Sequence, residues 1–298
     1  MASAPSIRVP VFFKRMTGKS ATSAWLQLAA LAAILLLAPM SRAQNWRLVW
    51  SDEFNGPAGT FPSATDWNFV HGWGPKNNHE IQWYCEPSDS NGPCEPKDPN
   101  LYLDGTGNLV VKAIHTGQRW SSARLNTMHK HSLLYGRVEA RIRMEPGAGF
   151  WPAFWLLGED HETAKWPDCG EQDIMEWVQK YGPGTTSSTI HGPGYSGAHG
   201  IGSTFPFPNN GRIDDGQFHT YGMTWSKDRM EFYRDDPTKP YFVVTPANLP
   251  PGQKWVYDHP FYVILNFAVG EAGFPGSTDA TTPHTGSMWV DYVRFYQQ

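Results

Sequence analysis

The stretch Gly170-Glu171-Gln172-Asp173-Ile174-Met175-Glu176-Trp177 carries three carboxylates within six residues, set among Ile, Met and Trp. In an extended strand, side chains alternate between the two faces, so Glu171 and Asp173 share a face and Glu176 points to the other. One extra residue in the strand, a β-bulge at position 174 or 175, would return Glu176 to the face of the other two acids. We therefore expect a bulged strand that presents its three acids in one row.

Such a row has the chemistry of a retaining glycosidase, which needs one ionised and one protonated carboxyl about 5–5.5 Å apart. Glu171 would be the nucleophile, and Glu176 the general acid that later acts as base. Asp173 would hydrogen-bond Glu171, and its charge would raise the pKa of Glu176 so that this carboxyl stays protonated. The alternative is a solvated acidic strand, although repulsion between like charges on one sheet face argues against it. Spacing alone leaves both interpretations open.

Three blocks of sequence resemble the family 16 glycoside hydrolases. The acidic stretch resembles their signature, Glu-x-Asp-x-x-Glu, in the bulged form typical of laminarinase-like endo-1,3-β-glucanases. Residues 150–158 resemble the family's Trp-Pro-Ala-Phe-Trp block, and residues 189–197 resemble a block common in bacterial laminarinases. Gln172 stands where an aliphatic residue is usual; it would point away from the acids, so we expect changed packing and intact catalysis.

The resemblance implies an endo-acting hydrolase that cleaves internal β-1,3-glucosidic bonds with retention and uses no cofactor in catalysis. Two rival hypotheses stay open. One is an enzyme of the same fold with another specificity, such as mixed-linkage 1,3-1,4-glucan, a galactan or transglycosylation. The other is a non-catalytic β-glucan-binding protein, but such relatives typically lose one or more of the acids, and all three are present here.

Outside the acidic stretch, short apolar runs alternate with Gly, Pro, Asn and Asp, and helix signals are scarce. Residues 137–144 alternate between apolar and charged, as a strand with one buried face would, whereas 261–269 is nearly all apolar, as a strand buried on both faces would be. Residues 219–225 and 230–233 form a predicted hairpin, and 288–296 a closing strand. These patterns predict a single all-β domain, an antiparallel sandwich. The resemblance narrows this to a jelly roll whose concave sheet forms a substrate cleft.

Two polar side chains are implied as substrate contacts. Residues 72–84 resemble the family's Gly-Trp-Gly-Asn-Asn-Glu-Leu-Gln-Tyr-Tyr block with two residues inserted, which puts Asn78 on the glucan at a minus subsite. A loop-capping Asn is the alternative. Residues 121–125 resemble a block whose Arg donates to sugar hydroxyls near the cleavage point, which assigns this role to Arg124. A surface ion pair is the alternative for this arginine.

Three ring side chains complete the predicted cleft. Trp151 and Trp155 lie four residues apart, so in a strand they face the same side. We expect their rings to stack on glucose at minus subsites, with core packing as the alternative. The resemblance places His191 near the plus side, where it would help Glu176 or contact the leaving sugar, with a structural histidine as the alternative.

A structural calcium is also expected. Asp291 matches a family position that often binds calcium on the convex face, with help from main-chain oxygens near Glu53. Hard oxygen ligands suit calcium, and its role would be stability. Among the three cysteines, Cys85 and Cys94 bracket a loop and are predicted to form a disulfide, which leaves Cys169 as a buried free thiol. No spacing of Cys and His matches a zinc site.

The first 43 residues have the pattern of a secretory signal peptide: basic residues, then an apolar run, then Ser41-Arg42-Ala43 as a small-x-small cleavage site. An uncleaved membrane anchor is the alternative. Residues 44–298 would form the catalytic domain, secreted or periplasmic. Its formal charge of −9 disfavours nucleic acid and anionic membranes as partners, and a neutral polysaccharide needs no basic patch. We expect no membrane association after cleavage, and a monomer.

Overall fold

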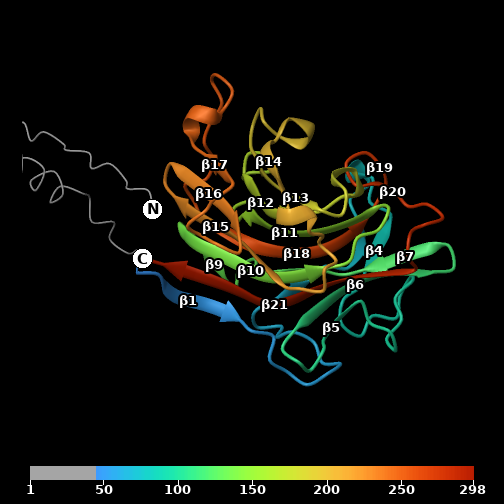
Figure 1. Cartoon of the computed structure of the whole chain (residues 1–298). Coiled ribbons are helices and arrows are strands. Elements are labelled where there is room, and N and C mark those ends of the chain that lie inside the picture. Colours follow the sequence, from blue (N-terminus) through green and yellow to red (C-terminus); the bar gives the residue numbers. More distant parts are fainter. Residues whose placement is uncertain (1–44) are drawn as a thin grey trace, which may run out of the picture. The chain divides into compact units, whose positions relative to one another are not determined.

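The computed structural model describes residues 45–298, and the predicted signal peptide lies outside this part. Two sheets face each other across a hydrophobic core (Figure 1), which confirms the predicted all-β sandwich. No helix in residues 45–298 is long and apolar enough to cross a membrane.

The strands are β1 (Arg47–Asp52), β2 (Asn68–Phe69), β3 (Gly72–Trp73), β4 (Gln82–Tyr84), β5 (Leu101–Leu103), β6 (Leu109–Thr116), β7 (Arg119–Ser122), β8 (Arg124–Asn126), β9 (Ser132–Leu133), β10 (Gly136–Met144), β11 (Phe150–Gly158), β12 (Glu171–Glu176), β13 (Thr185–His191), β14 (Ile201–Pro206), β15 (His219–Ser226), β16 (Arg229–Arg234), β17 (Phe242–Val244), β18 (Phe261–Val269), β19 (Glu271–Ala272), β20 (Gly276–Ser277) and β21 (Thr285–Gln297). Single-turn 3-10 helices occur at η1 (Lys76–Asn78), η2 (Gln179–Tyr181), η3 (Gly197–His199), η4 (Pro208–Asn210) and η5 (Pro246–Asn248).

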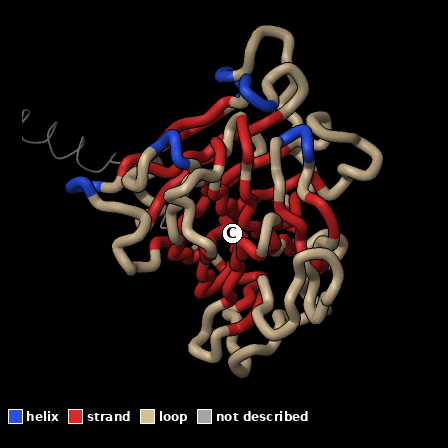
Figure 2. The backbone as a smooth tube through the Cα atoms, turned by 90° about the vertical axis from the view of Figure 1, so that its right-hand side faces the viewer, coloured by secondary structure: helices blue, strands red, loops and turns tan. Residues whose placement is uncertain are grey.

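The large sheet has 11 strands, in the order β17-β16-β15-β10-β21-β6-β7-β4-β3, with β1 beside β21 and β5 beside β6. The small sheet has eight strands, in the order β14-β13-β12-β11-β18-β8-β2, with β9 beside β18. Neighbouring strands of residues 45–298 are antiparallel except β4 and β7, which run parallel. Figure 2 shows the strands gathered in the middle of this part of the chain and the loops around them.

The patterns read from the sequence reappear as strands. In β10, Val138, Ala140, Ile142 and Met144 are buried in the core as predicted. Glu139 alternates with these residues and points outward as predicted, but it is buried on that face, where the hydroxyl of Tyr233 donates to its carboxylate over 2.6 Å. All nine residues of β18 are buried, which confirms the prediction of a central strand.

The cysteines are arranged as predicted. Cys85 and Cys94 form a disulfide that closes the loop between them. Cys169 is a free thiol, fully buried beside the start of β12. Burial raises the pKa of this thiol to about 11, so the thiolate that would react is disfavoured.

Candidate active site

The three acids lie on β12, and the register of this strand against its two neighbours shows a β-bulge. On the β11 side, Trp155 pairs with Asp173, and the preceding residue, Phe154, pairs with Met175. On the β13 side, the register shifts between Asp173 and Glu176. The strand therefore accommodates one extra residue, at position 174, which is one of the two positions that the sequence predicted.

The bulge returns Glu176 to the face that holds the other two acids. Residues paired across neighbouring strands point to the same face of a sheet. The side chains on this face form three transverse rows: Ala153, Glu176 and Ser187; Trp155, Asp173 and Thr189; Leu157, Glu171 and His191. The alternate residues Phe154, Leu156 and Ile190 belong to the hydrophobic core. The acids consequently line the face of the small sheet that points away from the core.

Indole groups hold the two glutamates. The Nε1 of Trp151 donates to Glu176 over 2.9 Å, and the Nε1 of Trp166 donates to Glu171 over 2.7 Å. Asp173 and Glu176 are only 3% and 6% exposed. Trp166 lies in the loop before β12 and is 46% exposed. Sequence reasoning missed this residue, since no motif marks it; an exposed Trp close to the acids was the available signal.

His191 contacts the acids from β13. Its Nε2 lies 3.1 Å from a carboxylate oxygen of Asp173 and 4.0 Å from one of Glu171. The hydroxyl of Tyr257 donates to the carbonyl of His191 over 2.9 Å, which fixes the main chain there. The resemblance places this imidazole near the plus side, where it would help Glu176 or contact the leaving sugar; the register sets it opposite Glu171.

Burial raises the pKa of every carboxyl in the row. Burial, and then the charge of Asp173, raises the pKa of Glu171 to about 8. Burial also raises the pKa of Glu176 to about 7, and burial together with the charge of Glu176 raises that of Asp173 well above its ordinary value. Interacting groups titrate jointly, so the row holds both protons and charge near neutral pH. These pKa values by themselves do not distinguish the nucleophile from the general acid.

Residues 97–294 match the family model "Glycosyl hydrolases family 16". The chain belongs to this family. The resemblance stated from the sequence is thereby confirmed, and the protein is a glycoside hydrolase.

The relatives of this family 16 chain differ in the substrates that their names give. The chain is 34% identical over 270 residues to the "Beta-glucanase" of Rhodothermus marinus, covering 86% of this chain and 87% of that protein. It is 33% identical over 270 residues to the "Keratan-sulfate endo-1,4-beta-galactosidase" of Sphingobacterium multivorum, covering 88% and 58%. The solved endo-beta-1,3-glucanase from Pyrococcus furiosus aligns with a TM-score of 0.73 at 38% identity, covering 85% of this chain and 94% of that one. The sandwich of this chain therefore has the jelly-roll fold of its solved relatives.

Arg124 and Trp155 meet on the same face of the small sheet of this family 16 enzyme. The Arg124 guanidinium carbon lies 4.7 Å from the centroid of the Trp155 ring, within cation–π range. The Nε1 of Trp155 donates to Asn266 over 2.7 Å, and Asn266 pairs with Arg124 across β18 and β8. Among residues 45–298, no carboxylate pairs with Arg124, so the surface ion pair weighed from the sequence is not formed.

Asn78 and Trp151 are connected indirectly, through Glu80, Gly270 and Phe274. Asn78 ends η1, is exposed, and contacts buried Glu80 through its Nδ2 at 3.4 Å. The main chain of Glu80 forms an isolated β-bridge with that of Gly270, at the start of the loop that carries Phe274. The ring of Phe274 lies 5.2 Å from that of Trp151. These contacts link Asn78 to Trp151, whose indole donates to Glu176, without a direct contact between Asn78 and the acids.

The side chains of the two residues at the predicted calcium site, Glu53 and Asp291, are paired with arginines. Both carboxylate oxygens of Glu53 accept hydrogen bonds from Arg294, at 2.9 and 2.7 Å. Asp291 accepts one from Arg141. In this structure both side chains therefore form ion pairs, and calcium bound with main-chain oxygens near Glu53 stays a prediction. Elsewhere, Glu171, Asp173 and His191 lie close enough together to hold a cation, which would compete with substrate for the nucleophile.

Proposed function

We propose that the protein is an exported endo-β-1,3-glucanase that hydrolyses laminarin-type glucans with retention of configuration. The observation that carries the proposal is the bulged row of Glu171, Asp173 and Glu176 on the outward face of the small sheet. The names of the Rhodothermus and Pyrococcus relatives support a β-glucan as substrate. Export is inferred from the predicted signal peptide, residues 1–43.

In the first step, Glu171 attacks the anomeric carbon while Glu176 protonates the departing glycosidic oxygen. The carboxylate of Glu171 is favoured by the indole N–H of Trp166 and by the nearby imidazole of His191, since both stabilise negative charge. Burial and, to a lesser extent, the charge of Glu171 raise the pKa of Glu176 to about 7, so an ionised Glu171 favours the proton on Glu176. Asp173 lies between the two on the same face of β12.

In the second step, the ionised Glu176 removes a proton from water, which attacks the glycosyl-enzyme and releases Glu171. Sugar hydroxyls on the minus side would be bound by Asn78 and Arg124, and pyranose rings would stack on the Trp151 and Trp155 side of the cleft. Each step uses only side chains of this chain, and the proposal includes no cofactor.

A second candidate substrate is a galactan or a mixed-linkage glucan. The observation that favours it is the similarity to a keratan-sulfate endo-1,4-beta-galactosidase at 33% identity, close to that of the β-glucanase relative. The catalytic row would be the same in either case. The cleft beyond it would decide the linkage.

The test is release of reducing sugar by residues 44–298 from laminarin, barley mixed-linkage glucan, keratan sulfate and agarose, with Glu171→Gln as the control. We expect release from laminarin that is lost in the control. NMR of the first product should show the β-anomer before mutarotation, whereas an α-anomer would contradict retention. Release from another glycan alone would overturn the substrate. Binding to laminarin without release would indicate a glucan-binding protein.

A further inference from the structure

The bulge in β12 interrupts the regular ladder, so a main-chain carbonyl there needs a donor from elsewhere. Ser188 of β13 lies opposite the bulge, between the residues that pair with Asp173 and Glu176. Its Oγ donates to the carbonyl oxygen of Ile174 over 2.6 Å, and Ser188 is fully buried. A side-chain hydroxyl thus satisfies the carbonyl of the extra residue.

A second hydroxyl holds the first. Ser188 has one hydroxyl proton and gives it to Ile174, so in its close contact with Tyr241 the tyrosine hydroxyl is the donor. Tyr241 directly precedes β17, the edge strand of the large sheet, and its main-chain N–H donates to Phe232 of β16 over 2.9 Å. The two hydroxyls therefore connect the large sheet to the bulge in the small one.

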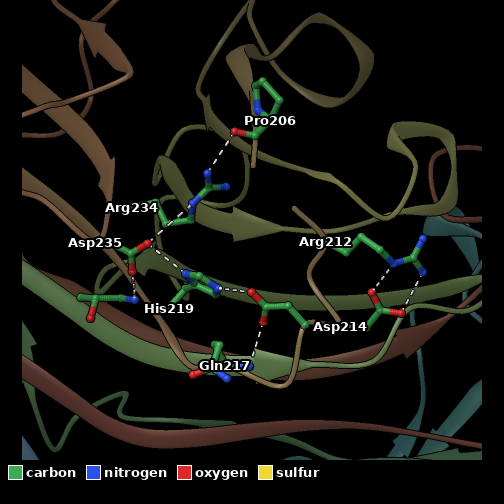
Figure 3. A network of polar contacts seen from close by, with 9 residues as sticks. Pro206, Arg212, Asp214, Gln217, His219, Arg234 and Asp235 are labelled. Carbon is green, nitrogen blue, oxygen red and sulfur yellow. Dashed lines mark hydrogen bonds and ion pairs between the residues drawn. The ribbon is translucent and has the colours of Figure 1, made fainter. Parts of the chain in front are cut away.

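The ring of Tyr241 is itself fixed in place. It stacks on Phe205 of β14 with centroids 4.2 Å apart and planes 7° from parallel. The guanidinium of Arg234 lies 4.4 Å from the centroid of Phe205, and its Nη2 donates to the carbonyl of Pro206 over 3.0 Å. Figure 3 shows Arg234 extending to Pro206, with Asp235 beside it. The Tyr241 ring is consequently held by stacking on Phe205, whose ring in turn contacts the guanidinium of Arg234.

We propose that Ser188 and Tyr241 are positioning residues for the general acid: they hold the bulge that turns Glu176 into the catalytic row. This inference rests on the proposed role of Glu176. Glu171 and Asp173 precede the bulge and keep their pairing with β11 and β13, so loss of the Ser188 donor displaces Glu176 relative to them. The defect therefore falls on protonation of the leaving group, not on nucleophilic attack.

Leaving-group dependence separates this effect from general damage. In natural laminarin the leaving group is a sugar hydroxyl, whose oxygen must be protonated by an acid as it departs. In a dinitrophenyl β-laminaribioside the leaving group is a phenolate, which departs without protonation. The measured quantity is kcat/KM, which reports steps up to formation of the glycosyl-enzyme, so the later base role of Glu176 does not enter. For Ser188→Ala and Tyr241→Phe we expect kcat/KM on laminarin to fall about tenfold to a hundredfold. On the dinitrophenyl substrate it should remain close to that of the wild type.

Two variants serve as controls. Ser188→Thr keeps the hydroxyl and should restore activity on laminarin. Ser203→Ala changes the residue directly opposite Ser188 on β14, whose hydroxyl makes only a local contact with Thr204, and should match the wild type. Equal losses on both substrates, or no loss on laminarin, would overturn the inference. A wild-type protein inactive on both substrates would instead overturn the proposed function.

Discussion

The indole of Trp166 acts on the catalytic row from a loop without a recognisable motif. Almost half of the side chain is exposed, yet its N–H is committed to Glu171 over 2.7 Å. A donor to the ionised form of a carboxyl lowers its pKa, and here it opposes the burial that raises the pKa of Glu171. The residue therefore favours the charged state that a nucleophile needs.

Replacing Trp166 by Phe should keep the ring and remove the donor. We expect kcat/KM on laminarin to fall about tenfold, the value of one hydrogen bond to a charged group. The acidic limb of the pH profile of kcat/KM should move to higher pH, because the pKa of Glu171 rises without its donor. Trp73→Phe, at an exposed position on β3 of the large sheet, is the matched control. An unchanged pH profile in Trp166→Phe would contradict this role.

Glu171 also makes stability depend on pH. Its pKa is raised from 4.5 to about 8 in the folded state, so its contribution to stability is complete below about pH 4.5 and is lost as pH rises toward 8. Glu171→Gln removes the ionisation from both states. We expect this variant to be more stable than the wild type by about 4 kcal/mol at pH 8 and nearly equal to it at pH 4. Urea unfolding at the two pH values measures the difference, and a stability gain that does not change with pH would argue against the raised pKa.

At the scale of the strand, β12 carries a polar side chain on its core face. Gln172 is fully buried, and neither atom of its amide has a hydrogen-bond partner among residues 45–298. An unpaired buried amide costs free energy that an aliphatic side chain would not. The prediction that Gln172 points away from the acids and changes only the packing agrees with its pairing with Leu156 and Ile190.

Gln172→Leu should therefore stabilise the fold by about 1–2 kcal/mol. Because the side chain lies on the face opposite the acids, kcat and KM should stay as in the wild type. Thermal unfolding and laminarin hydrolysis, measured side by side, test both parts. A lower melting temperature in Gln172→Leu would show that the Gln172 amide has hydrogen-bond partners in solution.

At the scale of the whole molecule, two arginine–carboxylate pairs occupy the positions where calcium was expected. Arg294 binds both carboxylate oxygens of Glu53, which ties the end of β1 to β21, and Arg141 of β10 binds Asp291 of β21. These pairs connect strands across the large sheet without a metal. Bidentate geometry makes the first of them the stronger.

Chelation should consequently leave the stability unchanged. We expect the same melting temperature in excess EDTA and in millimolar calcium, because an ion that binds only the folded state would raise it in proportion to its concentration. Differential scanning calorimetry at several calcium concentrations is the measurement. A steady rise of the melting temperature with calcium would restore the predicted site.

The sequence by itself determined the all-β class, the disulfide between Cys85 and Cys94, the bulge in β12 and the family. Each depends on local information: alternation along a strand, two cysteines around one loop, and an acid spacing that only a bulge can reconcile with one face. The buried strand β18 was equally readable, since a run of nine residues that is nearly all apolar fits a central position.

Only the tertiary structure decided which distant side chains complete the site. Trp166 reaches Glu171 from a loop, and Ser188 and Tyr241 reach the bulge between the acids through sheet packing. Nothing in their local sequence specifies these partners. Register placed His191 opposite Glu171, not Glu176. The same holds for Arg294 and Arg141, which pair with Glu53 and Asp291. Contacts between residues far apart in the chain depend on how strands are ordered in the sheets, which alternation along each strand does not encode.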